Sequence, residues 1–226
     1  MLGRERRRVE ADHKILIADD HPLFRGALKQ ALGGLAGSAD ILEAGDFETA
    51  KALVAGTAEL DLVLLDLSMP GASGLSGLIA LRGIDNAAPM VVVSAHDDPQ
   101  TIRRALELGA SGFISKSASL EEIRGAVQTV LAGGIAAPAG VDLGVEHDPE
   151  VSQLIARLQA LTPQQARVLG MIAEGLLNKQ IAYELGVSEA TVKAHVSAVL
   201  QKLGVDSRTQ AVIQLGKIGA DPARLS

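Results

Sequence analysis

A short apolar run that ends in a carboxylate constrains this chain more than any other feature. Residues Leu62–Leu65 are uninterrupted Leu and Val, the pattern of a strand buried on both faces of a parallel sheet. Asp66 ends the run, and Pro70, Gly71 and Gly74 prevent a helix or strand from continuing. Open α/β sheets bind ligands at the C-terminal ends of such strands. Asp66 is therefore a candidate ligand-binding residue, although a carboxylate that only caps a loop would look the same.

Apolar strands and helices alternate five times along residues 13–133. The expected strands are Lys14–Ala18, Ile41–Ala44, Asp61–Leu65, Met90–Val93 and Phe113–Ser115. The expected helices are Pro22–Leu35, Phe47–Ala55, Leu75–Ile84, Pro99–Leu108 and Leu120–Leu131, with Asp46 and Ser119 as caps. Five β-α units predict an α/β domain with a doubly wound, five-stranded parallel sheet.

Length and composition place a second domain after the first. A chain of 226 residues usually exceeds one hydrophobic core. We expect a flexible extension at 1–12, the α/β domain at 13–133, a Gly- and Pro-rich acidic linker at 134–160 and an all-α domain at 161–226. There is no Cys, which excludes disulfides and thiolate metal sites and favours a cytoplasmic protein. No apolar run is as long as a membrane span, so no membrane contact is expected.

The charges are distributed unequally between the two halves. Residues 13–135 carry 9 Lys and Arg against 15 Asp and Glu, whereas residues 151–226 carry 8 against 5. Any contact with nucleic acid is therefore assigned to the C-terminal end.

Polar side chains follow four of the expected strands, at the point where each strand ends. They are Asp19 and Asp20 after the first strand, Asp66 after the third, Ser94 after the fourth and Lys116 after the fifth. The carboxyl ends of parallel strands share one edge, so these groups should meet. Three neighbouring carboxylates need a cation to ionise together, and oxygen donors favour Mg²⁺. Lys116 would be a point charge suited to a phosphoryl oxygen.

Residues 161–226 have the pattern of a small helical domain. Thr162, Pro163 and Gln165 form a strong helix start, Asn178 is the expected cap of a short helix, and Ser188 the cap of the next helix. On that last helix Val192, Val196, Val199 and Leu203 recur at helical spacing, while Lys193, Ala194, Ser197 and Gln201 fall on the other side. A short helix, a Gly turn and a helix with a polar outer face describe a helix-turn-helix. A three-helix bundle with no DNA role has the same periodicity.

The first domain resembles the receiver domain of two-component response regulators, whose fold is flavodoxin-like. The likeness rests on Asp19-Asp20, the segment Leu65–Gly71, Ser94 and the segment Gly109–Lys116. It implies that Asp66 accepts a phosphoryl group and that Mg²⁺ is held by Asp20, Asp66 and the Ser68 carbonyl, with Asp19 acting through water. It also implies that Ser94 and Lys116 bind the phosphoryl group and that Phe113 is the aromatic switch residue.

The second domain resembles the LuxR-type DNA-binding domain, a four-helix helix-turn-helix unit. The motifs are Leu161–Pro163, Gly175–Ala182, Val187–Val196, Lys202–Gly204 and Ser207-Arg208. With the receiver they define the NarL/FixJ class, over about nine-tenths of the chain. The resemblance implies that Lys193, Ala194 and Ser197 face the major groove. It further implies DNA contacts from Lys179, Ser188, Thr191, His195, Lys202 and Arg208, and pairing of subunits through the last helix, Ser207–Ile218, with Val212 and Leu215 exposed.

These inferences predict a non-enzymatic, phosphorylation-controlled transcription regulator. A sensor histidine kinase would supply the phosphoryl group with Mg²⁺ as cofactor, and a homodimer would bind double-stranded promoter DNA. A different hypothesis is an aspartyl-phosphate phosphatase, which needs a second acid two residues after the nucleophile. Ser68 occupies that position and argues against turnover. A third hypothesis keeps DNA binding but makes the receiver a phosphate-independent dimerisation module.

Overall fold

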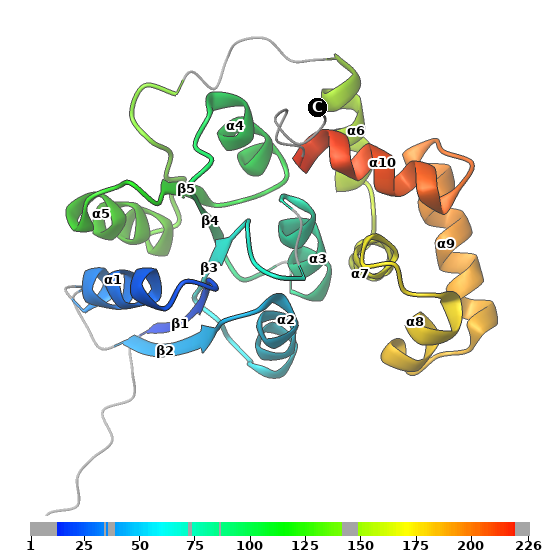
Figure 1. Cartoon of the computed structure of the whole chain (residues 1–226), viewed down its shortest axis with the longest axis horizontal. Coiled ribbons are helices and arrows are strands. Elements are labelled where there is room, and N and C mark those ends of the chain that lie inside the picture. Colours follow the sequence, from blue (N-terminus) through cyan, green and yellow to red (C-terminus); the bar gives the residue numbers. More distant parts are fainter. Residues whose placement is uncertain are drawn as a thin grey trace, which may run out of the picture.

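The computed structural model describes residues 13–33, 35, 39–71, 74–85, 87–141 and 149–219. The extension predicted at 1–12 lies outside these residues, as does part of the predicted linker. Within the described ranges the chain forms an α/β domain followed by a set of helices (Figure 1). The predicted fold class is therefore confirmed.

The sheet has the strand order β2-β1-β3-β4-β5, and every pairing is parallel. Its strands are β1 (His13–Ala18), β2 (Ala39–Ala44), β3 (Leu62–Asp66), β4 (Met90–Ser94) and β5 (Gly112–Ser115). The central strand β3 is buried throughout, as its unbroken apolar run predicts. The order reverses direction beside β1 and β3, so their C-terminal ends form the crevice where doubly wound sheets bind ligands.

Helices cover both faces of this sheet (Figure 1). One face carries α1 (Pro22–Leu32) and α5 (Leu120–Leu131), and the other carries α2 (Phe47–Gly56), α3 (Ser76–Ile84) and α4 (Pro99–Glu107). The predicted caps are present, because Asp46 and Ser119 each accept a bond from the backbone of the first helical turn. Asp98 caps α4 in the same way. Helix α1 ends three residues before the predicted Leu35, since Gly33 caps it.

Five further helices follow the receiver-like domain in the part of the chain that the structure describes. They are α6 (Pro149–Gln159), α7 (Pro163–Ala173), α8 (Asn178–Leu185), α9 (Glu189–Leu203) and α10 (Arg208–Gly219). Helix α6 lies inside the segment expected to be a linker, so that segment contains regular structure. Thr162 and Gln165 form the predicted capping box of α7, and Ser188 caps α9. The turn between α8 and α9 is made by Gly186 with a φ of 64°, a conformation that favours glycine.

Two local predictions in the helical domain are wrong. Asn178 is not the cap of α8 but its first residue, and Gln180 Oε1 instead accepts from the backbone nitrogen of Leu177 (2.7 Å). Leu215 is buried rather than exposed, because it packs into the core that the helical domain shares with the α/β domain. The exposed apolar residues of α10 are Val212 and Ile213.

The helical domain packs closely against the α/β domain through α7 and α3 (Figure 1). Glycines allow this approach. A methyl group added at Gly83 of α3 would lie 2.6 Å from the backbone nitrogen of Arg167, and one added at Gly170 of α7 would lie 2.8 Å from Cβ of Ala80. Nearby, Lys51 of α2 forms a half-buried ion pair with Glu174 (2.8 Å).

A second contact joins α4 to α6 and α10. Arg104 Nη1 donates to the carbonyl oxygens of Lys217 (3.0 Å) and Ile218 (3.2 Å), near the end of α10. Gln159 Nε2 of α6 donates to the carbonyl oxygen of Glu107, the last residue of α4 (2.5 Å). Within the described residues, no helix is both long and apolar enough to cross a membrane.

Candidate functional site

The carboxyl ends of β1, β3 and β5 bring two aspartates and a lysine into contact. Lys116 Nζ lies 2.8 Å from Oδ2 of Asp66 and 2.8 Å from Oδ2 of Asp19. Both carboxylates are about 1% exposed. The Lys116 ammonium also lies 5.1 Å from the centre of the Phe24 ring, within the range of a cation–π interaction. Residues separated by 97 positions along the chain, Asp19 and Lys116, thus share one pocket.

The pocket holds more negative than positive charge. Burial raises the pKa of Asp66 above its ordinary value, although bonds from Lys116 and from the backbone nitrogen of Ser68 (3.0 Å) oppose the rise. Burial alone would lower the pKa of Lys116, but its bonds to Asp19 and Asp66 outweigh burial and raise it. The two shifts have different main causes, burial for Asp66 and the two neighbouring carboxylates for Lys116, and the negative charge of Asp19 adds to the rise at Asp66. One ammonium thus faces the carboxylates of Asp19 and Asp66 in this pocket. The pocket therefore favours a further cation.

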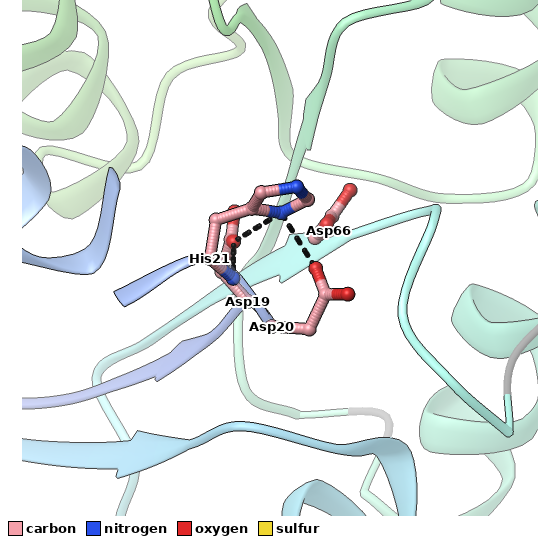
Figure 2. Close-up of side chains that lie close together, drawn as sticks. All are labelled: Asp19, Asp20, His21 and Asp66. Atoms are coloured by element: carbon pink, nitrogen blue, oxygen red, sulfur yellow. Dashed lines mark hydrogen bonds and ion pairs between the residues drawn. The ribbon is translucent and has the colours of Figure 1, made fainter. Parts of the chain in front are cut away.

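Asp20 and His21 complete the cluster on the solvent side (Figure 2). The ligand atoms of Asp19, Asp20, His21 and Asp66 all lie within 4.8 Å of one another. His21 Nδ1 is 2.6 Å from Asp20 Oδ1 and 3.4 Å from Asp19 Oδ1. His21 was not among the site residues predicted from the sequence. Its position directly after Asp20 at the end of β1 was the available signal.

The remaining residues predicted for the phosphate site are Ser94, Phe113 and Ser68. Ser94 is fully buried at the end of β4, and its hydroxyl accepts from the backbone nitrogen of His96 (3.0 Å). Phe113 is a core residue on the same edge strand as Ser115. Ser68 is exposed beside Asp66. A hollow of about 440 Å³, lined in part by His21, Phe24, Ser68 and Lys116, opens the pocket to solvent.

The polar face of α9 is free of the α/β domain along most of its length. Lys193, Ala194 and Ser197 are exposed, whereas Val192, Val196, Val199 and Leu203 form the inner face. Lys193 pairs with Glu189 one turn earlier (3.3 Å), a contact in which both side chains are at least half exposed. The predicted major-groove residues therefore share one accessible surface.

The other residues predicted to contact DNA divide into two groups. Lys179 and Thr191 are exposed, His195 is half-buried, and Ser188 accepts from the Thr191 backbone nitrogen as the cap of α9 (3.1 Å). By contrast, Lys202 and Arg208 make bonds within the domain. Lys202 Nζ donates to Ala160 O (2.8 Å) and Gln165 Oε1 (2.7 Å), and Arg208 donates to Asn178 Oδ1 (2.7 Å) and to the Leu176 carbonyl oxygen.

Comparison with known families agrees with this arrangement. Residues 15–128 match the response regulator receiver domain, and residues 159–215 match the luxR family of bacterial regulatory proteins. The chain therefore belongs to the response regulators that join a receiver domain to a LuxR-type helix-turn-helix domain, a family of DNA-binding transcription regulators.

Individual relatives resemble the chain over most of its length. It is 43% identical over 213 residues to the glycerol metabolism activator of Pseudomonas putida, and the alignment covers 91% of this chain and 96% of that protein. It is 35% identical over 208 residues to the nitrate/nitrite response regulator protein NarP of Escherichia coli (strain K12), which covers 88% of this chain and 93% of NarP. Both domains are thus shared with these relatives.

Solved structures share the fold. The structure of the two-component response regulator RcsB in complex with DNA aligns with a TM-score of 0.53 at 22% identity, covering 90% of this chain and 98% of that one. A LuxR family DNA-binding response regulator from Silicibacter pomeroyi aligns with a TM-score of 0.50 at 33% identity, covering 56% of this chain and 98% of that one.

Proposed function

We propose that Asp66 accepts a phosphoryl group from a sensor histidine kinase and that this modification controls promoter binding by the helix-turn-helix domain. The observation that carries the proposal is the contact of Lys116 Nζ with both Asp66 and Asp19, each at 2.8 Å. An aspartate nucleophile, an ammonium and a second carboxylate in one solvent-accessible pocket are the groups that phosphoryl transfer requires.

The transfer step uses few groups of the protein. An Asp66 carboxylate oxygen attacks the phosphorus of a phosphohistidine, a P–O bond forms, and the P–N bond breaks with its electron pair left on the imidazole. The Lys116 ammonium, already bonded to Asp66 Oδ2, neutralises charge on the transferred group. The Ser94 hydroxyl at the neighbouring strand end would supply a hydrogen bond after rotating away from the backbone nitrogen of His96.

Mg²⁺ is the proposed cofactor. The pocket fits such an ion because Asp19, Asp20 and Asp66 supply oxygen donors and because the charge in the pocket is not balanced by Lys116. Asp20, Asp66 and the Ser68 carbonyl would hold the ion, with Asp19 acting through water. The ion supplies charge neutralisation during transfer, while the chain orients Asp66 through the bond from the Ser68 backbone nitrogen.

Intact-mass measurement tests the phosphorylation site. The wild-type chain and Asp66→Asn are treated with acetyl phosphate and Mg²⁺, and we expect a single phosphoryl adduct on the wild type only. Asp46→Asn is the matched control, because Asn caps helix α2 about as well as Asp. Equal labelling of the wild type and Asp66→Asn would exclude Asp66 as the acceptor.

The protein is proposed to store the phosphoryl group rather than to turn it over. A phosphatase of this chemistry needs an acid two residues after the nucleophile to protonate the leaving group, and that residue is Ser68. Steady release of phosphate from small phosphate esters would support the enzymatic alternative instead.

Promoter binding is assigned to α9. Lys193, Ala194 and Ser197 share its exposed face, where Lys193 can donate to base edges and Ala194 can contact a thymine methyl. The RcsB–DNA complex is of the same fold. A homodimer on paired half-sites would follow from pairing through α10, where Val212 and Ile213 are exposed. We place this activity in the cytoplasm, because the regulator must reach both the kinase and the chromosome.

Phosphorylation is proposed to act on the contact between the domains. Helix α4 follows the strand that ends at Ser94 and precedes the strand that leads to Lys116. Its Arg104 donates to the carbonyl oxygens of Lys217 and Ile218 in α10. Movement of α4 toward a phosphoryl group on Asp66 would break these bonds and release the helical domain for dimerisation. A phosphate-independent receiver would instead leave DNA affinity unchanged by phosphodonor.

A further inference from the structure

The side chain of His21 reaches into the carboxylate cluster of the receiver. Its Nδ1 lies 2.6 Å from Asp20 Oδ1, 3.4 Å from Asp19 Oδ1 and 3.5 Å from the Lys116 ammonium. Figure 2 shows the imidazole ring beside the three carboxylates, with its Nδ1 nitrogen directed at Asp19 and Asp20. The ring is 64% exposed, so an ion can approach it from solvent. A histidine that only covers the core would be buried.

The backbone holds His21 in this position without using the ring. His21 is the N-cap residue of α1, yet its side chain makes no capping bond to that helix in the described chain. Its backbone nitrogen donates to Asp19 Oδ1 (2.7 Å), and its carbonyl oxygen accepts from the backbone nitrogen of Arg25 (3.0 Å). Pro22 fixes the next residue in the helical conformation. The ring is therefore oriented toward the pocket and not required for helix capping.

The spacing of the donor atoms suits an octahedral ion. Ligands about 2.1 Å from such an ion lie about 3 Å from their neighbours, and His21 Nδ1 lies 2.6 Å from Oδ1 of Asp20, which is proposed to hold the ion directly. Asp19 Oδ1, proposed to act through water, is farther from Nδ1, at 3.4 Å. The donors of all four residues lie within 4.8 Å of one another. A nitrogen donor distinguishes ions, because Mg²⁺ is bound through carboxylates and keeps several of its waters. Mn²⁺ accepts the same oxygen ligands, but it is a first-row transition metal, the series whose later members imidazole suits best.

We propose that His21 is a nitrogen ligand of the receiver's cation site and gives that site a preference for Mn²⁺ over Mg²⁺. The inference rests on the proposed function only in that both use the pocket around Asp66. It predicts a chain that binds Mg²⁺ through oxygen donors alone and Mn²⁺ through oxygen donors and His21.

Metal titration of the full chain tests the preference. Mn²⁺ binding is followed by the loss of the free-ion electron paramagnetic resonance signal, with Mg²⁺ as competitor. We expect His21→Gln to weaken Mn²⁺ binding on the order of tenfold or more, as loss of a metal-site group does, and to change Mg²⁺ binding by less than about twofold. His13→Gln is the matched control, because His13 lies at the opposite end of β1. Equal loss of affinity for the two ions would overturn the proposal.

A spectroscopic signature separates ligation from an indirect effect. Pulsed electron paramagnetic resonance of bound Mn²⁺ should detect a ¹⁴N nucleus in the wild type and in His13→Gln, and none in His21→Gln. Absence of this coupling in the wild type, or failure to bind Mn²⁺, would overturn the proposal.

The outcome is independent of the test of phosphorylation. If Asp66 is labelled with Mg²⁺ but no ¹⁴N coupling is present, only the role of His21 fails. If the coupling is present but Asp66 is not labelled with either ion, the metal site stands and the proposed phosphorylation fails.

Discussion

Replacing Gly83 by Ala should loosen the contact between the receiver and the helix-turn-helix domain. A methyl group at this position of α3 would lie 2.6 Å from the backbone nitrogen of Arg167 and 3.0 Å from the carbonyl oxygen of Pro163, both in α7. Ordinary contacts begin at 3.4 Å, and both clashing atoms belong to the backbone and cannot rotate away. Helix α7 must therefore move by about 0.8 Å. A gap of this size reduces the dispersion energy of each affected contact by about a quarter to a half.

We expect the substitution to destabilise the contact between the two domains and not the fold of the receiver. Overpacking of this kind costs about 1–3 kcal/mol, which lowers the ratio of docked to undocked molecules about 5- to 150-fold. Within α3 itself, Gly→Ala favours the helix by about 1 kcal/mol. The receiver should therefore stay folded while the domains separate.

Spin labels measure this separation directly. The chain has no Cys, so labels can be attached specifically to Ala55→Cys in α2 and Thr209→Cys in α10. We expect one narrow distance distribution in the wild type and a broad, longer one in Gly83→Ala. The control is Gly125→Ala in α5, where an added methyl group has nothing within 4 Å. Distributions that are the same in both variants and the wild type would refute the tight packing of α3 on α7.

Three further outcomes follow from single side chains. Burial would lower the pKa of Lys51, but its interactions with Glu174 and Glu48 together outweigh burial and raise it. The ion pair therefore stabilises docking fully below the ordinary pKa of 10.5, and this stabilisation is lost as the pH rises through the higher pKa of the docked form. The spin-label distances of the wild type should lengthen in strong alkali, and those of Lys51→Met should be long already at neutral pH. No difference between the two proteins would contradict this. Arg208→Ala should lower unfolding free energy by about 1.5–3 kcal/mol in urea, because its charged hydrogen bonds are internal, while Lys217→Ala should change it little. Lys193→Ala should weaken specific promoter binding by about 1–3 kcal/mol if Lys193 reads a base, and an equal loss in Lys217→Ala would indicate a general charge effect.

Local sequence signals predicted most of the elements because the forces that set them are local. The caps at Asp46, Ser119 and Ser188 depend on residues within one helical turn, and the buried strand at Leu62–Leu65 depends on its own apolar run. The convergence of Asp19, Asp66 and Lys116 followed from the rule that parallel strands end at one edge.

Contacts between distant residues were not predictable in this way. Asn is a residue type that often caps helices, but in the folded domain the amide oxygen of Asn178 accepts a hydrogen bond from Arg208, thirty positions later. Leu215 lies on a helix whose burial depends on packing outside its own sequence. Gly83 and Gly170 are weak helix formers when considered singly, and only the crossing of α3 and α7 shows why a side chain does not fit there. His21 is likewise defined by the rotamer that brings Nδ1 to Asp20.

The central claim is that phosphorylation of Asp66 controls DNA binding, and one titration tests it most directly. Affinity for a promoter fragment selected from genomic DNA is measured at fixed salt, with and without acetyl phosphate and Mg²⁺, for the wild type and for Asp66→Asn. The account predicts that phosphodonor tightens binding by the wild type and leaves Asp66→Asn unchanged. An equal response of the two proteins, or no response from a wild-type chain whose mass shows the phosphoryl adduct, would contradict it.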